Sequence, residues 1–121
     1  MIIQKFEDLI VWQKAQDFAV LVYKQFALIN DFGFKNQICR ASVSISNNIA
    51  EGFNRNSNLE FKRFLYISLA SNSELKSMLY LAYRLEYITE KEKLLLHEYS
   101  NEIGKITNGL INSIPNKKPN T

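Results

Sequence analysis

Positively charged residues and tyrosines are the side chains of this chain that could bind a ligand. Between residues 40 and 87 the basic residues are Arg40, Arg55, Lys62, Arg63, Lys76 and Arg84, and the tyrosines are Tyr66, Tyr80, Tyr83 and Tyr87. Lys and Arg bind phosphate oxygens, and tyrosine rings stack on unpaired bases, so this mixture is typical of proteins that bind single strands or irregular RNA. Tyrosines at helical spacing also form subunit interfaces or cores, and scattered cations also form solvated faces. Both interpretations stay open.

The distribution of charge favours the same region. The formal net charge is +3 and the sequence pI is about 9.0. Residues 32–88 carry seven Lys or Arg against four Glu, whereas the segments before and after them are close to balance. A mildly basic chain of this kind is compatible with an anionic partner without requiring one.

The sequence contains no recognisable set of catalytic or metal-binding residues. The chain has a single histidine, His97, and a single cysteine, Cys39. A di-iron bundle needs Glu-x-x-His on two helices, but the residue three positions before His97 is Leu94. Nothing in the sequence pairs a nucleophile with a base. We therefore expect no enzyme activity, no catalytic residue, no metal and no cofactor, with His97 partly exposed on a helix and Cys39 packed between helices.

A polar corner between residues 40 and 61 organises the chain. Gly52 predicts a left-handed end to one helix, and Ser57 with Glu60 three residues later predicts a capping box at the start of the next. Glu51 lies near a helix C-terminus, where the helix dipole opposes an acid, so it is expected to pair with Arg55, with Lys62 or with an Arg of a neighbouring subunit. Ser44 and Asn48 are expected to satisfy buried backbone groups or each other.

Hydrophobic periodicity predicts four helices. The first follows an N-cap at Asp8 and ends near Asn30, and the second runs from Lys35 or Asn36 to about Glu51. The third runs from Ser57 to about Tyr87, with small residues near its midpoint at Ser68, Ala70, Ser71 and Ser73. The fourth begins with a capping box of Thr89 and Glu92 and reaches Ile114, where Pro115 ends it. The predicted fold is an all-α, up-down-up-down antiparallel four-helix bundle in one domain, residues 1–114, followed by a disordered tail, residues 115–121.

The third predicted helix carries apolar or aromatic residues on almost every side, which predicts a homo-oligomer. The first residues of the chain carry charges at Lys5, Glu7 and Asp8, where a signal peptide would need an unbroken apolar core. No later run has the roughly 18 apolar residues of a membrane span. We therefore expect a cytoplasmic protein without a membrane partner.

Residues 37–88 resemble the central signature of the S23 ribosomal proteins, small four-helix-bundle proteins encoded in intervening sequences of bacterial 23S rRNA genes. The opening FEDLIVWQKAQDFAVLVY is similar to the N-terminal motif of that family. The matching positions include Trp12, Gln37, Arg40, Ser44, Asn48, Ile49, Ala50, Glu51, Gly52, Arg55, Ser57, Phe61, Phe64, Leu65, Ser71, Glu74 and Leu75. Departures from the pattern are Cys39 in place of a second Arg, Ser46 in place of a Pro, and Lys76 where an acid is common.

The resemblance implies an assembly and partners. The same family includes accessory variability proteins of diversity-generating retroelements, which form pentameric barrels, bind nucleic acid and partner a reverse transcriptase. The resemblance thus implies a homopentamer with RNA or DNA and a reverse transcriptase as candidate partners. The predicted function is a non-enzymatic oligomer that binds structured RNA or single strands with low sequence specificity. The alternative is a protein-interaction scaffold, or an accessory subunit such as one of a reverse transcriptase, with no nucleic-acid contact.

Overall fold

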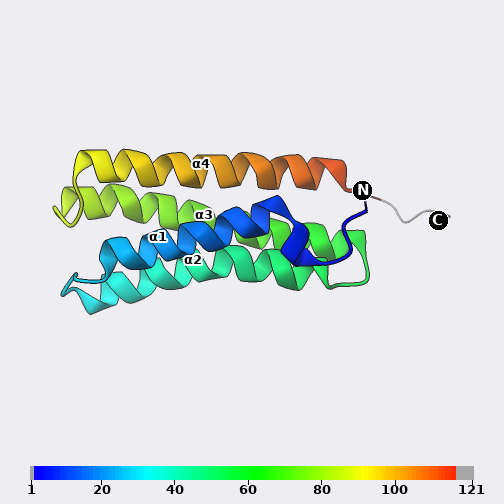
Figure 1. Ribbon diagram of the computed structural model, residues 1–121, viewed down its shortest axis with the longest axis horizontal. Coiled ribbons are helices and arrows are strands. Elements are labelled where there is room, and N and C mark those ends of the chain that lie inside the picture. The colour runs from blue at the N-terminus through cyan, green and yellow to red at the C-terminus, as the bar shows by residue number, and fades with distance from the viewer. Residues whose placement is uncertain (1, 117–121) are drawn as a thin grey trace.

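The protein is a bundle of four antiparallel helices, seen in a computed structural model that describes residues 2–116 (Figure 1). A short 3-10 turn, η1 (Phe6–Asp8), precedes α1 (Ile10–Phe26), α2 (Phe32–Phe53), α3 (Asn58–Arg84) and α4 (Glu90–Ser113). Successive helices run in opposite directions, and residues 2–116 contain no strand. The predicted up-down-up-down bundle is confirmed. The tail predicted from residue 115 lies mostly outside the described residues.

The first two helices begin at positions that differ from the prediction. Asp8 ends the 3-10 turn instead of capping α1, whose N-cap is Leu9. The ring of Phe6 packs edge-on against Trp12 at 5.2 Å between centroids, which anchors this turn against α1. The second helix starts at Phe32, because the Asp31 carboxylate accepts a hydrogen bond from the Phe34 backbone N–H at 3.1 Å. The predicted break at residues 31–33 therefore contains a helix cap.

The third helix ends at Arg84 instead of near Tyr87. Glu86 adopts a left-handed backbone with φ of 63°, and the Tyr87 N–H donates to the Ala82 carbonyl at 2.8 Å, which closes the helix end. Tyr87 then turns back over α2, where its Oη donates to Asp31 Oδ2 at 2.7 Å and its ring packs edge-on against Phe34. The capping box predicted for α4 is confirmed by both of its hydrogen bonds.

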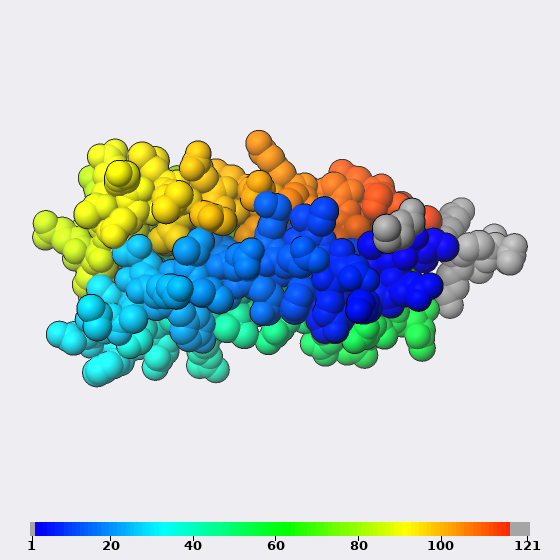
Figure 2. Space-filling model, in the orientation of Figure 1, coloured from blue at the N-terminus to red at the C-terminus, as the bar shows by residue number. Residues whose placement is uncertain are grey.

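Small residues bring α2 and α3 close together, as the serines near the middle of α3 predict. The Ser68 hydroxyl donates to the Ile45 carbonyl at 2.8 Å, and the Ser44 and Ser71 hydroxyls lie 2.8 Å apart. Around these polar contacts the core consists of fully buried aliphatic and aromatic side chains, the largest being Phe18, Phe26, Ile38, Ile45, Ile49, Leu65, Leu75, Leu79 and Ile103. In the space-filling view, α1 covers the middle of the visible face, between α4 on one side and α2 on the other (Figure 2).

Gly52 serves close packing, and the predicted left-handed helix end is wrong. Gly52 is buried within the last turn of α2, none of the glycines has a positive φ, and the helix ends at Phe53 with Asn54 as its C-cap, at φ of −81°. A Cβ at Gly52 would lie 2.5 Å from Cβ of Phe64, 3.2 Å from Cδ1 of Phe61 and 3.3 Å from the Phe61 carbonyl oxygen. Only a residue without a side chain lets the end of α2 approach the start of α3 this closely.

Candidate nucleic-acid interface

The six cations predicted to bind nucleic acid lie in separate places on the bundle. Arg40 is exposed on α2, and Arg84 lies in the last turn of α3. The other four comprise Arg55, Lys62 and Arg63 around the α2–α3 corner and Lys76 on the side of α3 that faces α4. The structure therefore brings Arg55 and Arg63 to the ring of Phe64, places Lys62 against Asn116, and disperses the rest.

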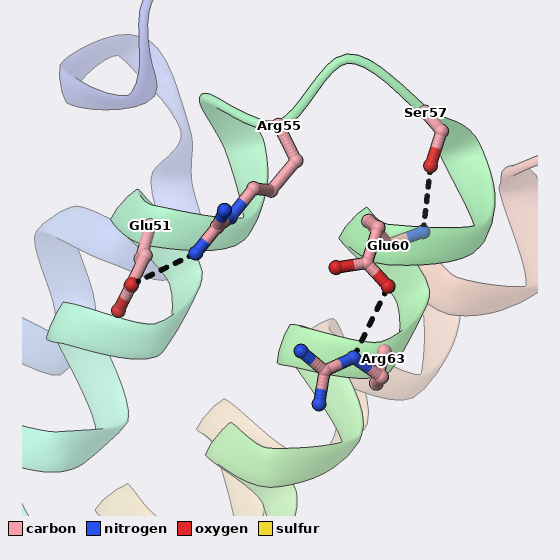
Figure 3. A network of polar contacts seen from close by, with 5 residues as sticks. All are labelled: Glu51, Arg55, Ser57, Glu60 and Arg63. Carbon is pink, nitrogen blue, oxygen red and sulfur yellow. Dashed lines mark hydrogen bonds and ion pairs between the residues drawn. The ribbon is translucent and has the colours of Figure 1, made fainter.

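Two arginines lie at the corner between α2 and α3, where Figure 3 shows each of them beside an acid. The guanidinium carbons of Arg55 and Arg63 both lie 4.9 Å from the ring centroid of Phe64, within cation–π range. Arg55 also pairs with Glu51 at 3.1 Å, as predicted, and Arg63 pairs with Glu60 at 3.2 Å. We call the group of Glu51, Arg55, Glu60, Arg63 and Phe64 the corner cluster. Each of its arginines is paired with an acid on its own helix or turn.

The capping box predicted at Ser57 is half formed. The Ser57 hydroxyl accepts from the Glu60 N–H at 3.0 Å, so Ser57 is the N-cap of α3. The Glu60 carboxylate, however, binds Arg63 instead of returning to the Ser57 N–H. Ion pairing at the corner has taken the place of the second capping contact.

Ser44 and Asn48 satisfy each other, as predicted. The Asn48 amide donates to the Ser44 carbonyl at 2.8 Å and to its hydroxyl at 2.9 Å. Next to this pair a groove runs between α2 and α3, with Arg40 on its wall and a Gln37–Glu74 hydrogen bond of 3.1 Å beside it. The groove mixes one cation with one acid, so it has no strong preference for an anion.

The tyrosines of α3 differ in how freely they could stack on a base. Tyr66 and Tyr80 are open, with 58% and 54% of their surface exposed, and Tyr83 is 38% exposed. The ammonium of Lys93 lies 4.4 Å from the ring centroid of Tyr83 and 5.5 Å from that of Tyr80. Tyr87 is engaged by Asp31 and Phe34, as described above. Tyr66 is the tyrosine of this set best placed to meet a ligand ring.

His97 is buried, and the prediction that it is partly exposed is wrong. Only 8% of the His97 surface is exposed, and its ring packs edge-on against Tyr80 at 4.4 Å between centroids. Its Nε2 has no hydrogen-bond partner among the described residues. Burial, together with the charges of Lys76 and Lys93, lowers the pKa of His97. Sequence periodicity missed this because His97 borders the predicted core stripe of α4 and is covered by α3.

A second groove, the α3–α4 groove, contains residues that the sequence interpretation missed. Its wall on α3 includes Ser73 and Lys76, and its wall on α4 includes Asn101, Lys105 and Asn108. These three α4 residues recur at four- and three-residue steps, which is the signal that could have revealed them as one helix face. The groove has a volume of about 330 Å³.

Carboxylates are absent from the lining of the α3–α4 groove, although α3 and α4 both carry acids. On α3, Glu60 turns to Arg63 and Glu74 turns to Gln37 of α2. On α4, Glu98 and Glu102 line the opposite groove toward α1, where Glu102 pairs with Lys14 at 3.2 Å. Lys105 borders both grooves, so it also lies beside Glu98 and Glu102, whereas the lining of the α3–α4 groove itself contains no acid.

Metal-binding clusters and membrane-spanning helices are both absent from residues 2–116. Within residues 2–116 no group of three or more His, Cys, Asp or Glu side chains is placed to hold a metal ion. In that same part of the chain, none of the helices has the length and apolar character needed to cross a bilayer. Cys39 is a free, buried cysteine, and burial raises the pKa of its thiol.

Comparison with known proteins supports the family resemblance. Residues 7–109 match the family described as 23S rRNA-intervening sequence protein. A similar solved structure is that of a protein with unknown function from the S23 ribosomal protein family of Bacteroides thetaiotaomicron. The two sequences are 31% identical, the match covers 86% of this chain and 100% of that chain, and the TM-score is 0.81. No curated protein matches this chain.

Proposed function

The chain belongs to the 23S rRNA-intervening sequence protein family, and on this premise we propose that it is a non-enzymatic homo-oligomer that binds nucleic acid. Its ligands are structured RNA or single strands, bound with low sequence specificity. Basic residues contact the phosphates, and exposed tyrosines contact the bases. Binding of this kind needs neither a catalytic residue nor a metal.

The observation that carries the proposal is the joint position of exposed tyrosines and of two lysines in a groove whose lining contains no carboxylate. Tyr66 and Tyr80 recur on the same face of α3 as Ser73 and Lys76, and that face adjoins the groove without carboxylates. A phosphate there meets positive charge and no acid within the lining, while the rings offer flat apolar surface to unpaired bases.

Exposed apolar residues support the oligomer. Ile67 and Leu81 on α3 retain 37% and 46% exposure, and Leu94 and Leu95 on α4 retain 56% and 52%. Apolar side chains in this number on neighbouring helices are typical of surfaces that a further subunit covers. A pentamer is the assembly that the family resemblance implies. Several copies of one basic surface would add phosphate contacts and raise the affinity for a long strand.

Two measurements test this function. Fluorescence anisotropy with labelled RNA, single-stranded DNA and duplex DNA should show binding at low salt that weakens steeply as salt rises, because phosphate contacts release counterions. Light scattering at micromolar protein should give a multiple of the 14.1 kDa chain mass. Absence of binding to every nucleic acid at low salt would refute the nucleic-acid function, and a mass of one chain would refute the oligomer.

The pairing of the corner arginines favours a second candidate, a protein-interaction scaffold. Arg55 and Arg63 each hold an acid, which reduces their attraction for phosphate. A helical partner such as a polymerase could use this corner without any nucleic-acid contact. A chain that is oligomeric but shows no salt-sensitive binding to nucleic acid would support the scaffold.

A further inference from the structure

We propose that the α3–α4 groove binds the sugar-phosphate backbone of a single-stranded nucleic acid. Lys76 and Lys105 contact phosphates from its two walls, and Tyr66 and Tyr80 stack bases at its two ends. This inference rests on the proposed function and assigns the binding to one site. It adds α4 residues to the interface, which the cations and tyrosines recognised from the sequence did not include.

The groove has the chemistry of a backbone site. Lys76 and Lys105 supply charge from opposite helices, and Ser73, Asn101 and Asn108 supply hydroxyl and amide groups that can donate to phosphate or sugar oxygens. The lining contains no carboxylate, although Lys105 also borders the groove that Glu98 and Glu102 line. The lining therefore attracts an anion and gives it several hydrogen-bond donors.

The floor of the groove is held in place before any ligand arrives. The Asn72 amide donates to the Ser100 carbonyl at 2.9 Å, and the Ser100 hydroxyl donates to Asn72 Oδ1 at 2.8 Å. Gly104 lies beside this pair, where an added Cβ would be 3.5 Å from Asn72 Nδ2. The absence of a side chain at Gly104 keeps the space above the pair open, so a larger residue there should fill the groove.

The groove fits one strand better than two. Packed helix axes lie about 8–10 Å apart, and the groove between two such helices admits a single chain but only the edge of a duplex. Along α3, Tyr66 and Tyr80 are 14 residues apart, which corresponds to about 21 Å at the rise of an α-helix. This length accommodates a short run of nucleotides between the two rings.

Tyr66 and Tyr80 lie beyond the two ends of the groove lining, on the face of α3 that carries Ser73 and Lys76. Tyr80 packs against His97 at one end, and the Lys62 ammonium contacts Asn116 Oδ1 at the other. Tyr66 lies one turn from Lys62 on the same helix, so it faces the part of α4 around Gly109. A Cβ at Gly109 would have no neighbour within 4 Å, so the surface beside Tyr66 is open.

The test compares two double variants by anisotropy with a labelled oligouridine, an oligothymidine and a duplex of equal length. K76Q/K105Q removes the two groove lysines, and K24Q/K91Q removes two exposed lysines outside the groove. The groove variant should bind both single strands at least tenfold more weakly than the control, with a log–log salt slope smaller by about 2. Thermal unfolding should be the same for the two variants.

Two further variants test the stacking and the shape of the groove. Tyr66→Ala should weaken single-strand binding about 5- to 100-fold, the range expected for loss of one stacked base, whereas Tyr66→Phe should keep the affinity. Gly104→Leu should fill the groove and weaken binding to a similar degree without loss of helix content. The oligouridine and oligothymidine arms distinguish RNA from DNA as the source of the strand.

The outcomes separate this inference from the proposed function. If the wild type binds but K76Q/K105Q equals K24Q/K91Q, the groove is not the site, while the proposed function stands. Loss of binding in R55Q/R63Q under those conditions would assign it to the corner cluster. Equal affinity for duplex and single strands in the wild type would refute the preference for one strand. A wild type that binds no nucleic acid would refute the proposed function and the groove together.

Discussion

Replacement of Gly52 by alanine should destabilise the protein, although alanine is the better helix former. The added Cβ would lie 2.5 Å from Cβ of Phe64, whereas carbon atoms in contact prefer about 3.5–4.0 Å. Cβ of Phe64 is fixed to its backbone and cannot rotate away. The ends of α2 and α3 must therefore move apart by about 1 Å to accept one methyl group.

The magnitude follows from two opposed terms. Overpacking against a fixed atom costs about 2–3 kcal/mol, and the change from Gly to Ala within a helix returns about 1 kcal/mol. The free energy of unfolding should therefore fall by about 1–2 kcal/mol. For a chain of 121 residues this corresponds to a decrease in Tm of roughly 3–10 °C.

Gly109→Ala is the matched control for this prediction. A Cβ at Gly109 in α4 would have no neighbour within 4 Å, so the same substitution should stabilise the protein by about 0.5–1 kcal/mol. Urea and thermal unfolding followed by circular dichroism at 222 nm, at one protein concentration, should show Tm shifts of opposite sign. If Gly52→Ala is as stabilising as Gly109→Ala, the close approach of α2 to α3 is not tight and the argument fails.

Three further changes test other contacts. The lowered pKa of His97 means that the unfolded chain, with a histidine pKa of 6.5, takes up the proton first, so the free energy of unfolding should fall as pH drops below about 6.5. His97→Phe should remove this pH dependence of the free energy of unfolding between pH 7 and 5. The pKa values of Asp31 and Glu92 are also lowered, but they affect the free energy of unfolding only below about pH 4.5. An unchanged pH profile in the variant would contradict the role of His97. Thr89→Ala should cost about 1 kcal/mol through loss of the α4 N-cap, measured by urea unfolding, and a cost near zero would show that the capping box is dispensable. Ser68→Ala should lower the free energy of unfolding by about 1 kcal/mol, because the Ile45 carbonyl loses its buried donor. Ser68→Val should lower it further through overpacking. Equal stability of both variants and the wild type would refute the contact.

Features that depend on near neighbours in the sequence were predictable. Thr89 caps α4 through a residue three positions away, and Asn48 and Arg55 bind partners four positions before them. Such contacts follow from the helix repeat alone, which brings residues three and four apart onto one face. The four helices and their order follow from the same repeat.

The candidate site was only partly predictable. The lysines and tyrosines of α3 could be recognised, but Lys105 and the asparagines of α4 became part of a site only when α4 was seen to border α3 with that face. The absence of carboxylates from the groove also depends on which neighbouring helix each acid faces. Neither property is encoded in the spacing within one helix.

The amino-acid sequence by itself thus specifies the four helices, the N-caps at Ser57 and Thr89 and the family, because each of these rests on contacts a few residues apart or on sequence likeness. Tertiary packing specifies the rest: the burial of His97 by Tyr80, the return of Tyr87 to Asp31, and the need for glycine at position 52. These contacts join residues 9 to 56 positions apart. They arise when helix faces meet, and the choice of which faces meet depends on how all the side chains fill one core.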